Sequence, residues 1–199
     1  MIIMSQKADR NYNKRAAFTN VITSIDLTSC LPHQIFVGIW SKFLFFESDR
    51  IFSPSFAGAM QDLILAEQST CCCLLNASRT EVMDFEKACS IFLDSTINEN
   101  EYYEQLRTGG PAEGWLFSMD RYGCASDKGG WSIYCEKNND VAVIGLQNPG
   151  DVEQLALPLK KLHAEPITKL VEQASTAVFP FSELTEEWRS ELSRHYAHR

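Results

Sequence analysis

The segment from Gly114 to Leu146 constrains the fold of this chain more than any other stretch. It holds three short apolar runs, at 115–119, 131–135 and 141–146, which polar connections separate. The connections contain glycine or asparagine, residues that reach positive φ at little energetic cost and therefore suit turns between antiparallel strands. The segment predicts an antiparallel β-meander over residues 114–146, with a long polar loop at 120–130 between its first two strands.

Helical spacing of apolar residues, preceded by capping residues, predicts several helices outside the meander. The predicted helices start near Ser53-Pro54, Ser78, Asn98, Pro166 and Thr185. A glutamate three residues after Ser78 and after Asn98 matches the capping-box spacing, in which two side chains satisfy backbone N–H groups reciprocally. A buried strand is predicted at Cys71 to Leu75. About five helices packed with an antiparallel meander define an α+β fold.

Two segments, 18–27 and 35–46, fit both the helical and the strand period, and periodicity alone does not separate these alternatives. The sheet accordingly has either three strands or five. Residues 1–15 are polar and basic, and we expect them to form a flexible N-terminal segment. No repeat or shift in composition divides residues 16–199, which predicts a single α+β domain.

The chain is acidic, with a formal net charge of −8 at pH 7, and its apolar fraction of 45% is ample for a core. An acidic body repels the phosphate backbone, so nucleic acid is not an expected partner, whereas a basic protein is. No apolar run reaches the length of a membrane span or of a signal-peptide core. We therefore expect a cytoplasmic protein that does not bind a membrane.

The seven cysteines have a placement typical of reduced thiols. Residues 71–73 are consecutive cysteines, and neighbouring side chains of a strand point to opposite faces, so the three cannot all pair on one side. The four histidines are His33, His163, His195 and His198. Their spacing matches no metal-binding pattern, and no glycine-rich nucleotide motif is present. We therefore expect no metal and no cofactor.

A cysteine-dependent enzyme is the alternative hypothesis for the function. The predicted loop at 120–130 carries Cys124 among polar residues, and His163 is the mid-chain histidine that could act as its base. A nucleophilic thiol needs a nearby imidazole or helix terminus to become a thiolate. Under this alternative, the protein would be a small hydrolase or transferase that uses Cys124 with His163.

Carboxylates occur next to aromatic residues in two segments with helical spacing. Glu99, Glu101 and Glu104 accompany Tyr102 and Tyr103, and a second group of glutamates surrounds a tryptophan near the C-terminus. This composition is typical of a surface that engages lysine and arginine of a basic partner. It is equally typical of a solvated helix face, where acidic residues in the first turn favour the helix dipole.

Three sequences of the meander form a pattern of aromatic, aliphatic and acidic positions. They are Trp115-Leu116-Phe117-Ser118-Met119, Trp131-Ser132-Ile133-Tyr134-Cys135 and Asp140-Val141-Ala142-Val143-Ile144. The pattern resembles the core hairpins of small cytosolic immunity proteins that accompany bacterial polymorphic and contact-dependent-inhibition toxins. The resemblance is confined to residues 114–146. It implies a non-enzymatic inhibitor that binds one cognate toxin domain, often a basic nuclease, and blocks its active site.

We therefore expect a cytosolic immunity protein that neutralises a basic toxin domain by docking an acidic surface. Charge complementarity would come from the meander and from the segment after Asn98, with tyrosines as anchors. The predicted partner-binding residues are Asp120, Tyr122, Asp127, Glu136, Asp140, Glu99, Glu101, Tyr102, Tyr103 and Glu104. No catalytic or metal-binding residue is assigned.

Overall fold

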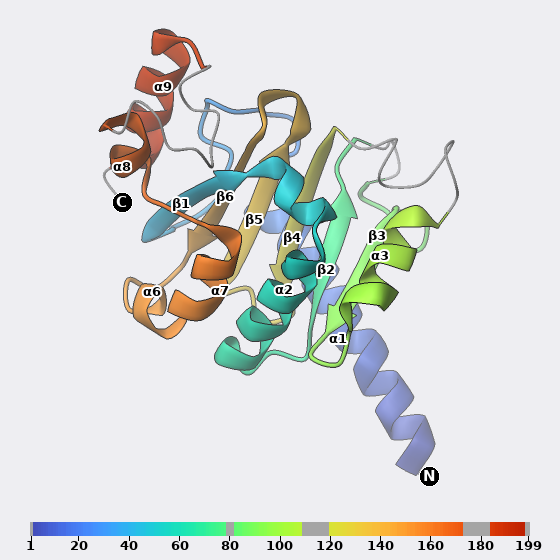
Figure 1. Cartoon of the computed structure of the whole chain (residues 1–199). Helices are drawn as coiled ribbons and strands as arrows, with labels where there is room; N and C mark the ends of the chain where they lie inside the picture. The colour runs from blue at the N-terminus through green and yellow to red at the C-terminus, as the bar shows by residue number, and fades with distance from the viewer. Residues whose placement is uncertain (1, 79–81, 109–119, 173–183, 198–199) are drawn as a thin grey trace.

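Six strands of the described residues form an antiparallel sheet at the centre of the fold (Figure 1). The computed structural model describes residues 2–78, 82–108, 120–172 and 184–197. The strands are β1 (Lys42–Glu47), β2 (Cys71–Asn76), β3 (Ser90–Asp94), β4 (Arg121–Ser126), β5 (Trp131–Glu136) and β6 (Val141–Leu146). Their order in space is β1-β6-β5-β4-β2-β3, so β1 and β3 are the edge strands among the residues that the structure describes.

Helices cover both faces of this sheet, which makes the fold α+β. The helices of the described residues are α1 (Ile2–Ser24), α2 (Pro54–Glu67), α3 (Glu99–Arg107), α6 (Asp151–Gln154), α7 (Ala156–Leu162), α8 (Ile167–Glu172) and α9 (Glu186–Tyr196). Short 3-10 helices, η1 (Ser48–Phe52) and η2 (Lys137–Asn139), follow β1 and β5. In Figure 1, α2, α3 and α7 lie in front of the sheet and α1 crosses behind it.

The strands contribute side chains alternately to two apolar cores, one on each face of the sheet. In β2, Cys72 packs in the core under α2, whereas Cys71 and Cys73 pack in the core under α1. Because both faces are covered, buried strands of this sheet are apolar at consecutive positions. The strands predicted at 71–75, 131–135 and 141–146 are therefore confirmed as β2, β5 and β6.

The meander differs from the prediction in its first strand. Residues 121–126, predicted as part of a polar loop, form β4, while the run predicted as a strand at 115–119 lies outside the described residues. Gly123 allows β4 to lie close beneath α1, because a Cβ at this position would be 2.7 Å from Val21 Cγ1. Glycine here permits close packing of a helix on a strand and does not mark a turn.

The helix predicted from Ser78 is wrong. The described residues 82–89 form turns and short irregular stretches, and residues 90–94 form β3, which pairs with β2. The Ser78 hydroxyl accepts hydrogen bonds from the N–H groups of Asp120, at 3.1 Å, and Arg121, at 2.9 Å, instead of capping a helix. Strand pairing with β2 therefore overrides the local helical pattern.

The structure resolves both segments whose periodicity was ambiguous. Residues 18–24 belong to α1, which also includes most of the predicted N-terminal segment 1–15. The segment 35–46 combines the end of an irregular stretch, residues 25–41, with most of β1. The described part of the chain contributes six strands to the sheet, where three or five were expected. The helices predicted near Ser53, Asn98, Pro166 and Thr185 are confirmed as α2, α3, α8 and α9.

Candidate functional site

Helix α3 carries the candidate binding surface, and its first turn is held by a complete capping box. Asn98 Oδ1 accepts the N–H of Glu101 at 2.9 Å, and Glu101 Oε2 accepts the N–H of Asn98 at 3.4 Å. On the inner face of the helix, Tyr102 and Leu106 are fully buried. The Tyr102 hydroxyl donates to the carbonyl of Ile51 at 2.6 Å. The cap and the buried face together fix the direction in which α3 presents its outer side chains.

We define the α3 surface as the exposed residues Glu99, Glu101, Tyr103, Glu104 and Arg107. Tyr103 is 38% exposed, and the Arg107 guanidinium lies 5.6 Å from the centre of its ring, in a cation–π contact. Within the described residues, Glu99 and Glu104 make no ion pair. The α3 surface thus combines unpaired carboxylates with an aromatic ring that already contacts a cation.

The acidic residues predicted on the meander are divided between the two ends of the sheet. Asp120, Glu136 and Asp140 lie at the end where β4 and β6 begin and β5 ends. Asp127 lies at the opposite end, where its Oδ1 accepts the N–H of Thr70 at 2.9 Å. The four acids therefore do not form one surface, and Asp120 is the exposed member of the set.

Glu136 is a buried structural residue, and its predicted contact with a partner does not fit this position. The residue is 5% exposed. Its Oε1 accepts hydrogen bonds from the N–H of Leu31, at 2.7 Å, and from the hydroxyl of Tyr134, at 2.8 Å. Its Oε2 accepts from the side-chain amide of Asn139 at 2.8 Å. These bonds join β5 to residues 25–41 and to η2.

Two of the three predicted tyrosine anchors are core residues, so their interpretation as surface groups is wrong. Tyr102 and Tyr122 are at most 1% exposed, and burial raises the pKa of both phenols well above its ordinary value. The Tyr122 hydroxyl donates to the carbonyl of Ser48 at 3.1 Å. Tyr103 is the predicted anchor that remains at the surface.

Asp140 supports the turn between β5 and β6. It occupies the left-handed region, with φ of 54°, and its Oδ1 accepts the hydroxyl of Ser48 at 2.9 Å. Burial raises the pKa of the Asp140 carboxyl above its ordinary value, the charge of Asp49 adds to this effect, and the bond from Ser48 opposes it. Asp140 is therefore held by neighbours within the fold.

Cys124 and His163 do not form a nucleophile–base pair. Cys124 is fully buried on β4, with its Sγ 4.0 Å from Met60 Sδ of α2. Burial raises the pKa of the Cys124 thiol well above its ordinary value, so the thiolate does not form near neutral pH. His163 is an exposed residue at the C-terminal end of α7, and no hydrogen bond joins the two side chains.

His163 lines a hollow of about 720 Å³ beside the edge strand β1. Its lining includes the apolar Leu44 and Leu159 and the basic Lys42 and Lys160. Its described lining contains no hydroxyl or thiol side chain, the groups that most often act as nucleophiles.

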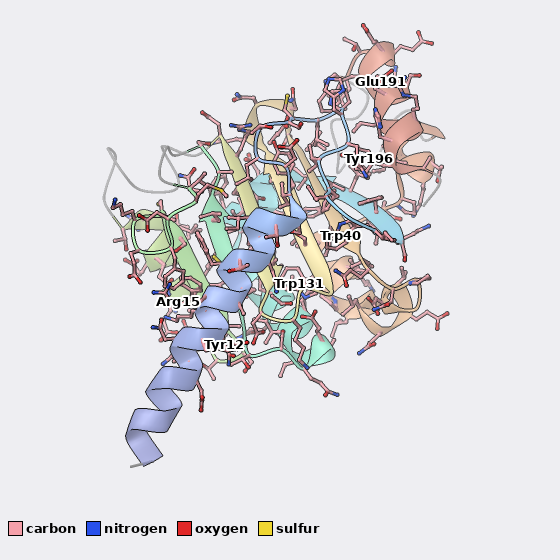
Figure 2. The ribbon with its side chains drawn as sticks, turned by 180° about the vertical axis from the view of Figure 1, so that it is seen from behind. Tyr12, Arg15, Trp40, Trp131, Glu191 and Tyr196 are labelled. Atoms are coloured by element: carbon pink, nitrogen blue, oxygen red, sulfur yellow. The ribbon has the colours of Figure 1, made fainter. Side chains whose placement is uncertain are left out.

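A cluster of potential metal ligands forms where α9 meets residues 25–41. Ligand atoms of His33, Glu191 and His195 lie within 4.8 Å of one another. Figure 2 shows Glu191 and Tyr196 on α9, next to the blue chain of this N-terminal region. The spacing of the histidines did not indicate this cluster, because the fold brings His33 to α9 from a distant part of the chain.

Comparisons with profiles of known protein families, with curated protein sequences and with solved structures find no match for this chain. None of the helices in the described residues combines the length and the apolar character that a membrane span requires.

Proposed function

We propose that the protein is a non-enzymatic binding protein of the immunity class, which neutralises a basic toxin domain in the cytoplasm by docking through the α3 surface. The observation that carries the proposal is the exposed Tyr103 ring on the same helix as the unpaired carboxylates of Glu99 and Glu104. The formal charge of the whole chain, −8, favours encounter with a basic partner.

The side chains of the α3 surface suit a partner that presents lysine or arginine. Tyr103 can anchor an interface because an aromatic side chain buries a large area with few rotatable bonds. A cation of the partner would approach this ring as Arg107 does within the chain. Docking at Glu99 and Glu104 would not require any described ion pair to break. A standard interface buries about 800 Å² on each side. The surface next to α3 would therefore contribute the part of this contact area that the α3 surface does not supply.

A cysteine-dependent hydrolase or transferase has less support. The thiol of Cys124 is buried and protonated, and His163 lies at the surface on α7. Catalysis by this pair would require the core between β4 and α2 to open, which would expose apolar side chains to water.

The test measures binding to the protein products of genes adjacent to that of this chain, because an immunity gene lies beside its toxin gene. Each product is immobilised, and association and dissociation rates are measured for the wild type, for Tyr103→Ala and for Glu99→Gln/Glu104→Gln. We expect Tyr103→Ala to weaken binding by at least about 10-fold. The double variant should slow association at low salt and reduce its salt dependence, because it removes charge that steers encounter.

The matched control is Glu186→Gln/Glu187→Gln, which removes the same charge from exposed positions on α9, far from α3 (Figure 1). We expect this control to bind with nearly the affinity of the wild type. Unchanged binding by Tyr103→Ala, or equal weakening in the control, would contradict docking through the α3 surface. Absence of binding to every neighbouring product would contradict the immunity function itself.

A further inference from the structure

We propose that His33, Glu191 and His195 bind a divalent transition-metal ion such as Zn²⁺, in preference to Mg²⁺ or Ca²⁺, where α9 meets residues 25–41. The potential ligand atoms already lie within 4.8 Å of one another, and Figure 2 shows Glu191 at this junction. Two imidazole nitrogens and one carboxylate oxygen are a ligand set that zinc binds in proteins, with a fourth position open to water. Imidazole ligands favour zinc over magnesium and calcium, which prefer oxygen.

The two ligands on α9 are spaced as a zinc site requires. Glu191 and His195 are four residues apart, so they share one face of the helix. His195 Nε2 lies 3.5 Å from Glu191 Oε2. Ligands of a tetrahedral zinc ion at about 2.1 Å lie about 3.4 Å from each other, so this pair needs little movement. His33 is exposed, so rotation of its side chain can shorten the remaining distances between ligand atoms, which are at most 4.8 Å.

The backbone at His33 is held against α9 by a buried tyrosine. The Tyr196 hydroxyl donates to the carbonyl of His33 at 2.7 Å and accepts the N–H of Ile35 at 3.1 Å. Tyr196 is 2% exposed and directly follows His195 in the helix. The fold therefore brings the third ligand to the other two without help from a metal, which is the pre-organisation that a binding site needs.

A cation of the protein already lies between two of the proposed ligands. Arg194 Nη2 is 2.5 Å from Glu191 Oε2 and 3.3 Å from His195 Nε2. The Arg194 side chain is 66% exposed, so a metal ion can displace it into solvent. Because the guanidinium and the metal compete for the same carboxylate, removal of Arg194 should strengthen metal binding.

The test is calorimetric titration of the metal-free, full-length protein with ZnCl₂, and with MgCl₂ for comparison. We expect one zinc site per chain and no magnesium binding. His33→Ala and His195→Ala should each weaken zinc binding by at least about 10-fold, and Arg194→Ala should tighten it. The controls are His163→Ala, at an exposed histidine elsewhere, and Cys30→Ser, at an exposed thiol near His33. Both controls should bind zinc as the wild type does.

Thermal unfolding provides a second readout that separates loss of the site from loss of the fold. Zinc at 100 times its dissociation constant should raise the Tm of the wild type by about 5–10 °C, because the ion links α9 to residues 25–41. The His33→Ala variant should keep the metal-free Tm of the wild type and lose the zinc-dependent rise. The proposal is overturned if the wild type binds no zinc, if both histidine variants retain binding, or if Cys30→Ser abolishes it.

Discussion

Glu136 is a carboxylate that the fold removes almost completely from solvent. Burial of a charged group is costly, and the hydrogen bonds from Leu31, Tyr134 and Asn139 offset that cost. The same bonds attach residues 25–41 to β5. At the scale of single residues, Glu136 was predicted from the sequence to lie in a binding surface, but it stabilises the interior of the protein.

We expect Glu136→Ala to lower the free energy of unfolding by about 2–4 kcal/mol, because the N–H of Leu31 and the hydroxyl of Tyr134 would lose their acceptor inside the protein. Urea denaturation followed by circular dichroism measures this loss. Asp120→Ala, at an exposed acid of the same sheet end, is the control and should change stability by less than about 0.5 kcal/mol. Equal losses in both variants would contradict a specific role for the buried carboxylate.

At the scale of elements, the contact between α1 and β4 depends on the absence of a side chain at Gly123. A Cβ there would lie 2.7 Å from Val21 Cγ1 and 3.1 Å from Ile25 Cδ1. Farther along the same contact, the side-chain amide of Asn20 donates to the carbonyl of Ser126 at 2.8 Å. Helix α1 is thus held to β4 by apolar packing and by a polar contact.

The variant Gly123→Ala should destabilise the fold by about 1–3 kcal/mol, because the β-branched side chains of Val21 on α1 and of Ile25 directly after α1 cannot move aside without disturbing the packed core. The control is Gly150→Ala, before α6, where an added Cβ meets no atom within 4 Å. Thermal unfolding of the two variants checks the difference. If Gly123→Ala unfolds at the wild-type temperature, α1 does not pack on β4 as closely as the structure indicates.

At the scale of the whole molecule, Tyr196 connects the C-terminal helix to the N-terminal part of the chain. Its ring packs edge-to-face on Phe43 and Phe45 of β1, with ring centres 5.0 and 5.4 Å apart. Its hydroxyl bonds to the backbone of His33 and Ile35. One side chain therefore joins α9, β1 and residues 25–41.

Replacement of this tyrosine by phenylalanine keeps the ring packing and removes the two hydrogen bonds. We expect Tyr196→Phe to lower the free energy of unfolding by about 1–2 kcal/mol, since the N–H of Ile35 would remain buried without its acceptor. Equilibrium denaturation measures the effect. Tyr12→Phe is the matched control, at a side chain that is 74% exposed on α1 (Figure 2). A similar loss of stability in this control would contradict the assignment of the effect to the hydrogen bonds of the Tyr196 hydroxyl.

Several predictions that rested on neighbouring residues were confirmed, although the helix predicted from the capping-box spacing after Ser78 was not. The capping box of Asn98 and Glu101 spans a single helical turn, and the apolar runs of β5 and β6 are continuous patterns. Strand β3 was missed because its apolar residues also fit the helical spacing that follows Ser78, and β4 was missed because its glycine and polar residues are typical of a loop. From the sequence alone, Gly123 indicates a turn, and only the structure shows that α1 packs against this position. Residues 90–94 form a strand because they pair with β2.

The candidate site shows the same difference between features that local sequence predicts and features that depend on tertiary packing. By itself, the sequence determined the α+β class, the capped start of α3 and the presence of carboxylates around Tyr103, because these depend on contacts along a short stretch of chain. Only the tertiary structure decided that Tyr122 and Glu136 are buried and that His33 lies beside His195. The physical reason is that burial and the meeting of distant side chains depend on which segments pack together, and local spacing does not contain that information.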